Sequence, residues 1–164
     1  EILKQTCDLV AGGAGRLGLR ARLLIEPVYT TVVGSPAPLA RLVDEVASPC
    51  VRGHMDIANC LRFDLIFDHA AYIRDGFRTL GDRIHSAHIK DVAPAESYFP
   101  GLVEKQVGEG VMDLPTYLQC LAEMPADFTV VIEHLSALAD IRRSHERIRA
   151  LAAELHIDTW STDA

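Results

Sequence analysis

Short apolar stretches alternate with longer amphipathic segments along most of this chain. Each apolar stretch ends in a polar residue, a loop follows, and apolar residues then recur three or four positions apart. A strand followed by a helix, repeated in this order, is typical of βα units built around a parallel sheet. The apolar stretches read LLIEP (23–27), CVRGHMD (50–56), IHSAHIKD (84–91) and FTVVIEHL (128–135). The pattern therefore predicts an α/β fold with four βα units.

The amphipathic segments predict helices over about 36–47, 64–81, 113–123 and 138–155. Asp113 is expected to cap the third of these, because its carboxylate can accept a hydrogen bond from a free N–H group of the first turn. The chain also opens with apolar residues at helical spacing. We expect the glycines at positions 12, 13 and 15 to end that first helix, because glycine suits the left-handed turn after a last helical turn.

Composition narrows the kind of protein. The chain has 164 residues and 49% hydrophobic content, enough for one globular domain over residues 1–164. A formal net charge of −7 argues against a nucleic-acid partner, because phosphate backbones select basic surfaces. No apolar run approaches the roughly 18 residues of a membrane span, so we expect a soluble protein without a membrane partner.

The four cysteines indicate a reducing compartment. They are Cys7, Cys50, Cys60 and Cys120, and no two of them form a C-x-x-C pair. Widely spaced cysteines of this kind are typical of free thiols rather than of a disulfide framework. We therefore expect a cytoplasmic protein.

Each apolar stretch carries a residue near its end that can bind a metal ion. These residues are Glu26, Asp56, His88 and Glu133. A single acidic residue at a strand end more often caps a helix or lies on the surface, but four at the same point of successive units favour a shared site. Because side chains alternate along a strand, Ile84, Ser86 and His88 are expected on one face. Three carboxylates and one imidazole suit Mn²⁺, Mg²⁺ or Co²⁺.

The order and spacing of several motifs resemble those of the sugar phosphate isomerase/epimerase family, the xylose isomerase-like TIM barrels. The motifs are LLIEP, HMDIANC, RIHSAHIKDV, VGEGVMDLPTYL and VVIEHLS, closed by SHERIRALAAELHI, from about residue 20 to 157. The resemblance implies a (β/α)₈ TIM barrel of which this chain supplies the C-terminal half, with strands five to eight. It also implies that Glu26, Asp56, His88 and Glu133 hold a divalent metal and that the two glutamates move protons.

The function that this resemblance implies is isomerisation or epimerisation of a sugar, a sugar phosphate or a related hydroxy-carbonyl compound. A divalent ion that chelates a carbonyl and its neighbouring hydroxyl lowers the energy of an enediolate. Glu26 and Glu133 are then expected as the base that removes a proton from carbon and the acid that returns it.

Three further residues are expected to bind the substrate. Asn59 stands where many relatives carry a histidine, and its amide can donate a hydrogen bond but does not titrate near neutral pH. Lys90 is expected to face the substrate with Asp91 balancing its charge. A Schiff base at Lys90 is a rival chemistry, and a structural salt bridge is the other alternative. His54 is expected one layer below Asp56, as a hydrogen-bonded histidine. The sequence VAPAESYFPG lacks the arginine that epimerase relatives carry in this region.

Other interpretations stay open on the same barrel. They are a metal-dependent lyase or dehydratase, a phosphoesterase of the endonuclease IV type, and a half-barrel that binds a sugar without turning it over. The GEG sequence at 108–110 indicates a tight loop rather than a phosphate site, and His134 is expected at the barrel rim. Four units leave two sheet edges bare, so we expect a homo-oligomer or a missing N-terminal half.

Overall fold

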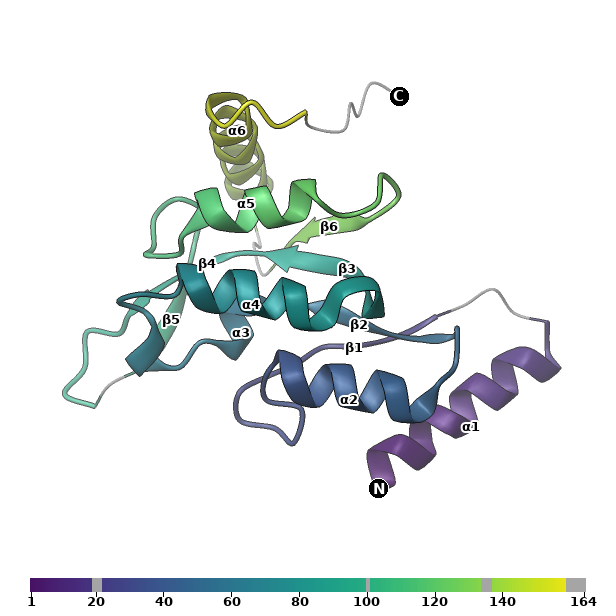
Figure 1. The fold of residues 1–164 in the computed structure, drawn as a ribbon. Helices are drawn as coiled ribbons and strands as arrows, with labels where there is room; N and C mark the ends of the chain where they lie inside the picture. Colours follow the sequence, from purple (N-terminus) through teal and green to yellow (C-terminus); the bar gives the residue numbers. More distant parts are fainter. Residues whose placement is uncertain (19–21, 100, 134–136, 159–164) are drawn as a thin grey trace.

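A parallel four-stranded sheet forms the centre of the protein (Figure 1). The computed structural model describes residues 1–18, 22–99, 101–133 and 137–158. The strands are β1 (Leu23–Ile25), β2 (Val51–Met55), β3 (Ile84–Ile89) and β6 (Thr129–Ile132), in the order β1-β2-β3-β6. All three pairings are parallel, which confirms the predicted α/β class.

Helices cover one face of this sheet. The longer ones are α1 (Ile2–Arg16), α2 (Pro36–Val46), α4 (Ala70–Leu80), α5 (Leu114–Ala122) and α6 (Leu138–Glu154). Figure 1 shows α2, α4 and α5 side by side over the sheet. Leu39 of α2 and Ile73 of α4 are fully buried, and they belong to one core with Met55 and Ile89 of the strands. Each such side chain contributes about 1.5–3 kcal/mol by leaving water.

Two predicted helix boundaries are wrong. Helix α1 runs through its glycines and ends after Arg16, because a glycine within a helix costs only about 1 kcal/mol. Gly18 has a φ of 62° and provides the left-handed turn. The segment 64–81 is not one helix: it holds the short 3₁₀ helix η1 (Phe63–Leu65) and then α4.

The loop ahead of α4 is fixed by a buried histidine. Nδ1 of His69 lies 3.0 Å from the carbonyl oxygen of Ile66, and its Nε2 accepts a hydrogen bond from the backbone N–H of Asp113 over 2.7 Å. Asp113 itself caps α5 as predicted, because its Oδ1 accepts from the N–H of Thr116. The starts of α4 and α5 are thereby held together.

Strand β3 contains one extra residue where it pairs with β2. Gly53 pairs with Ile84, but His54 pairs with Ser86, so His85 has no counterpart on β2. Ile84 consequently lies on the helix side, where a Cβ built on Gly53 would meet both Ile84 and Leu39. The prediction that Ile84 shares a face with Ser86 and His88 is therefore wrong, because this bulge reverses the alternation.

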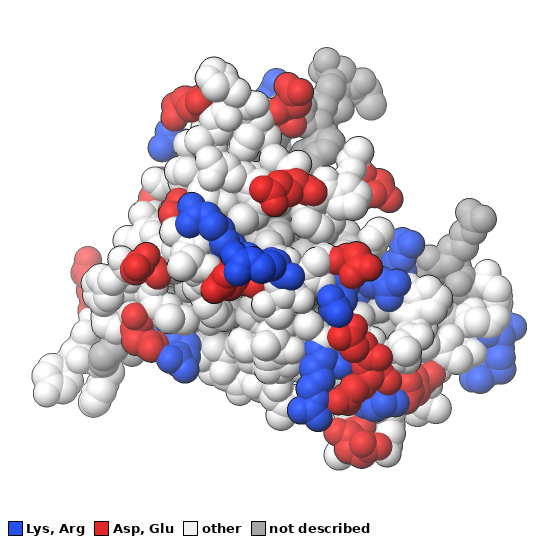
Figure 2. All heavy atoms as spheres, in the orientation of Figure 1, with Lys and Arg blue, Asp and Glu red and all other residues white. Residues whose placement is uncertain are grey.

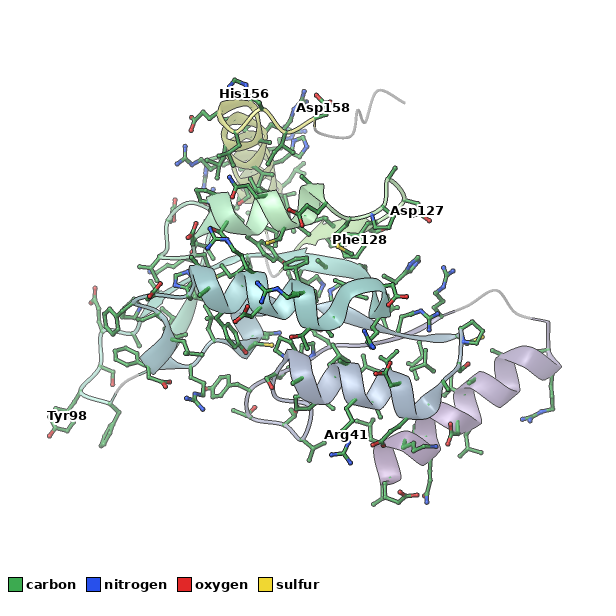
Figure 3. All side chains as sticks on the ribbon, viewed as in Figure 1. Arg41, Tyr98, Asp127, Phe128, His156 and Asp158 are labelled. Carbon is green, nitrogen blue, oxygen red and sulfur yellow. The ribbon has the colours of Figure 1, made fainter. Side chains whose placement is uncertain are left out.

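An antiparallel hairpin follows β3 and was not predicted. It consists of β4 (Asp91–Pro94) and β5 (Leu102–Lys105). Figure 3 labels Tyr98 near its tip, pointing away from the body of the protein, and this side chain is 94% exposed. The hairpin therefore starts directly beside the end of β3 and projects into solvent.

The surface of the helix-covered face carries both signs of charge. Figure 2 shows lysine and arginine interspersed with aspartate and glutamate on this face. Within the described ranges, none of the helices has the length and apolar character needed to cross a lipid bilayer. Cys7, Cys50, Cys60 and Cys120 are all free thiols, as predicted.

Candidate metal centre

Four side chains meet beyond the carboxyl ends of the parallel strands. Glu26, Asp56 and Glu133 each directly follow a strand, and His88 lies near the end of β3. One ligand atom from each residue lies within 4.8 Å of all the others. The structure thus brings together the four residues that were expected to converge.

The imidazole of His88 lies among the three carboxylates. Its Nδ1 is 3.4 Å from Oε1 of Glu26, 3.5 Å from Oδ2 of Asp56 and 3.3 Å from Oε2 of Glu133. Ligands on one ion with bonds of about 2.1 Å lie about 3.0 Å apart at right angles and about 3.4 Å apart at tetrahedral angles. The donor set and its spacing therefore fit a divalent cation.

The two carboxylate oxygens of Asp56 have different contacts. Oδ1 accepts a hydrogen bond from the N–H of Asn59 and caps the short helix α3 (Ile57–Cys60), whereas Oδ2 faces His88. The carboxylate is 1% exposed. The sequence interpretation as a helix cap and the interpretation as a ligand are therefore compatible at this position.

The carboxylate of Glu26 is held by the amide of Asn59. Nδ2 of Asn59 donates to Oε1 of Glu26 over 2.7 Å. This is the same oxygen that faces His88. Asn59, expected to contact substrate, thus orients a member of the cluster.

His88 is supported by two neighbouring side chains. The hydroxyl of the fully buried Tyr117 donates to the backbone carbonyl of His88 over 2.6 Å. The ring of His54 packs edge-on against that of His88, with centroids 4.0 Å apart. Tyr117 was not predicted, because an apolar position on a helix gives no sign that its hydroxyl reaches a strand end.

His54 is a buried histidine one layer below the cluster. Its Nδ1 lies 2.6 Å from the hydroxyl oxygen of Ser86. Burial, and then the nearby His88, lower the pKa of His54 to about 4, although Asp56 and Glu133 oppose this shift. His54 is therefore neutral at pH 7, and its expected contact with substrate stays a prediction.

Lys90 joins the cluster from the junction of β3 and β4. Its ammonium group lies 2.9 Å from Oδ2 of Asp56, 2.6 Å from Oε2 of Glu133 and 3.2 Å from Oε1 of Glu104 on β5. Burial disfavours the charged form, but the hydrogen bond to Glu133 and the charge of Asp56 outweigh it and raise the pKa of Lys90 above its usual value. A charged lysine is a poor Schiff-base nucleophile.

The expectation that Asp91 balances the charge of Lys90 is wrong. Its buried carboxylate accepts hydrogen bonds from four backbone N–H groups at 2.9–3.0 Å, those of Val92, Gly108, Gly110 and Met112. The GEG sequence is therefore a tight loop, as predicted, and it is wrapped around a carboxylate of the chain itself. Lys90 is balanced instead by Asp56, Glu104 and Glu133. His134 lies outside the described residues.

An apolar groove lies apart from this cluster, between α5 and α6. Its volume is about 620 Å³, and Leu121, Val130 and Ile148 contribute to its lining. Figure 3 labels His156 and Asp158, which belong to the same lining. The groove opens on the helix side of the sheet and contains none of the four clustered residues.

Comparison with known proteins identifies the fold family. A family model described as xylose isomerase-like TIM barrel matches residues 5–151. The chain belongs to this family. The resemblance inferred from the motifs is thereby confirmed. A comparison with curated proteins gave no significant match.

Solved structures of this family share the fold at low sequence identity. A magnesium complex of a xylose isomerase-like TIM barrel protein from Mycobacterium smegmatis has a TM-score of 0.66 and 14% identity, over 94% of this chain and 50% of its own. A xylose isomerase domain protein from Planctomyces limnophilus has a TM-score of 0.67 and 19% identity, over 94% and 52%. A D-psicose 3-epimerase, solved in the presence of D-fructose, has a TM-score of 0.57 and 20% identity, over 92% and 53%. The chain spans about half the length of these relatives.

Proposed function

We propose that the protein containing this chain is a divalent-metal-dependent isomerase or epimerase of a sugar, a sugar phosphate or a related hydroxy-carbonyl compound. The observation that carries the proposal is the convergence of Glu26, Asp56, His88 and Glu133, with ligand atoms within 4.8 Å of one another. Membership of the xylose isomerase-like family and an epimerase among the solved relatives support it. Residues 1–164 would form a single domain, the C-terminal half of the barrel.

The four clustered residues would hold Mn²⁺, Mg²⁺ or Co²⁺. When bound, such an ion supplies Lewis-acid stabilisation of the negative charge that develops on a substrate carbonyl oxygen. Glu26 and Glu133 project from opposite edge strands of the sheet toward the same point. One carboxylate would accept a proton from the carbon beside the carbonyl, and the other would return a proton to the neighbouring carbon or to the opposite face.

Substrate contacts are proposed for three residues. The amide of Asn59 lies next to Glu26, and Lys90 lies next to Glu133, so both flank the carboxylates that would move the proton. The ring of His54 packs against the ring of His88 beneath these residues.

The free cysteines are consistent with the reducing cytoplasm. The exposed inner side of β6, where Val131 is 44% exposed, is consistent with a missing N-terminal half or with a homo-oligomer.

Deuterium exchange tests this function. The protein containing this chain is incubated in D₂O with a panel of ketoses and ketose phosphates, with EDTA or with added Mn²⁺. We expect deuterium at a carbon beside the carbonyl only when metal is present. Glu26→Gln and Glu133→Gln should each lower the exchange rate by at least about 100-fold, whereas Glu123→Gln, an exposed residue after α5, should not change it. Exchange that is indifferent to EDTA would overturn the proposal.

A further inference from the structure

Lys90 is a cation in the middle of a carboxylate cluster. Its side chain is 3% exposed, and its ammonium nitrogen lies within 3.2 Å of three carboxylates. Two of these, Asp56 and Glu133, use the same oxygen atoms, Oδ2 and Oε2, that face Nδ1 of His88. The ammonium group therefore occupies coordination positions on the same oxygens that a metal ion would need.

We propose that Lys90 is a built-in counter-cation of the site, which holds Asp56 and Glu133 together without metal and links metal binding to the β4–β5 hairpin through Glu104. The inference rests on the metal site of the proposed function and assigns a new role within it. Lys90 is here a positioning residue.

Electrostatics predicts whether Lys90 strengthens or weakens metal binding. The carboxylates of Glu26, Asp56 and Glu133, with ligand oxygens within 4.8 Å of one another, repel one another. A buried carboxylate without a counter-charge is costly. Lys90 offsets one of these negative charges. A divalent cation bound to the same oxygens would be repelled by the ammonium group, because like charges about 4 Å apart interact strongly in a partly buried site. Metal binding should therefore weaken the pairs of Lys90 with Asp56 and Glu133.

Glu104 then becomes the remaining partner of Lys90. It lies on β5, and its backbone pairs with that of Val92 on β4. The backbone beside Lys90 is fixed, because the carboxylate of Asp91 accepts four N–H bonds from its own strand and the 108–112 loop. The hairpin itself is far more exposed, with Tyr98 94% and Phe99 75% exposed. A change in the Lys90–Glu104 pair should therefore change the backbone hydrogen exchange of β5.

Metal titration of the Lys90→Met variant tests the counter-cation. By calorimetry, we expect this variant to bind Mn²⁺ at least about tenfold more tightly than the unsubstituted protein. Its thermal midpoint without metal should fall by several degrees, and Mn²⁺ should raise it more than in the unsubstituted protein. A merely structural defect would weaken metal binding instead. Lys105→Met removes the same charge from an exposed position on β5 and should change the affinity by less than about threefold.

Hydrogen exchange of the hairpin tests the link and does not depend on the folding of Lys90→Met. Adding Mg²⁺ to the unsubstituted protein should slow backbone exchange at residues 101–105. Glu104→Gln, at a residue whose side chain is 45% exposed, should abolish this response. An unchanged exchange pattern in the unsubstituted protein, or a response that persists in Glu104→Gln, would overturn the link.

The outcomes separate the two proposals. If the unsubstituted protein binds no Mn²⁺, both are wrong. If it binds Mn²⁺ and Lys90→Met binds with equal or lower affinity, only the counter-cation role is overturned. If Lys90→Met binds more tightly but the unsubstituted protein incorporates no deuterium into any ketose, the counter-cation role stands and the isomerase activity is overturned.

Discussion

The hydroxyl of Tyr117 donates a hydrogen bond to the backbone carbonyl of His88 over 2.6 Å. Tyr117 lies on α5 and His88 near the end of β3, so this bond ties the helix layer to the strand that carries the imidazole of the cluster. Tyr117 is 1% exposed, and the side chain of His88 is 17% exposed. A group that holds the fold together thus also fixes a candidate ligand.

Replacing Tyr117 with phenylalanine should lower the free energy of unfolding by about 1–3 kcal/mol, because the part-buried carbonyl of His88 loses this hydrogen bond. Urea denaturation followed by circular dichroism measures this. Tyr72→Phe is the matched control: its hydroxyl lies 3.5 Å from the carbonyl oxygen of Cys60, at the limit of a hydrogen bond. Equal losses in the two variants would contradict the assigned importance of the Tyr117 bond.

Gly110 should not tolerate a side chain. A Cβ at this position would lie 2.2 Å from Oδ1 of Asp91 and 2.4 Å from the carbonyl oxygen of Val92. Gly110→Ala should therefore destabilise the protein by about 2–4 kcal/mol, through loss of the bonds that Asp91 accepts. Thermal unfolding checks this result.

The control for this change is a glycine with free space. A Cβ on Gly15 of α1 would meet nothing within 4 Å. Gly15→Ala should raise stability by about 0.5–1 kcal/mol, because alanine favours the helix. Should both alanine variants behave alike, the 108–112 loop would not be held as described.

The amide of Asn59 should matter for metal binding. It orients Glu26 through a 2.7 Å hydrogen bond, and loss of such an outer partner commonly weakens metal affinity about 10–100-fold. Asn59→Ala should raise the dissociation constant for Mn²⁺ by that factor, as measured by calorimetry. The cap of α3 should survive, because it uses the backbone N–H of this residue. An unaltered dissociation constant would show that Glu26 is oriented by other groups.

The thiol of Cys60 should make stability fall at high pH. Burial, and then the charge of Asp56, raise the pKa of Cys60 to about 12. The unfolded thiol has a pKa of about 8.5. The contribution of the neutral Cys60 thiol to the free energy of unfolding is therefore complete below that pH and is lost as the pH rises toward 12. Between pH 8 and 10 the free energy of unfolding should drop by about 2 kcal/mol from this group.

Urea unfolding at both pH values measures the Cys60 contribution. Cys60→Ala should show a correspondingly smaller drop than the unsubstituted protein. Alkylation adds a second measurement: iodoacetamide should modify the half-buried Cys50 well before Cys60, which is 2% exposed. Rapid alkylation of Cys60 in the folded protein would contradict its assignment as a buried neutral thiol.

The strand-end residues were predictable because they depend on local pattern and on a general property of parallel sheets. Glu26, Asp56 and Glu133 each follow an apolar run, and successive parallel strands bring their carboxyl ends to one edge. The local sequence pattern is therefore enough to predict that these side chains converge. That these residues bind a metal ion stays a prediction.

The partners of Lys90 and Asp91 could not be predicted from the same pattern. Glu104 reaches Lys90 only because β5 folds back along β4, and a hairpin of four-residue strands gives a weak periodic signal. Asp91 is adjacent to Lys90 in sequence, but its carboxylate turns to the backbone of the 108–112 loop. Proximity along the chain suggested a charge pair, whereas the buried carboxylate of Asp91 is satisfied by four backbone N–H groups instead.

The extra residue in β3 makes this strand sensitive to changes in length. His85 has no counterpart on β2, and from Ser86 onward the side chains alternate in step with β2 and β6. Deletion of a residue between Ser86 and His88 would turn the imidazole toward the helices and leave the cluster one ligand short. Removing His85 instead would restore even pairing with β2 and would keep Ile84 on the helix side, opposite Gly53. The position of a deletion relative to the bulge thus decides whether His88 keeps its place in the cluster.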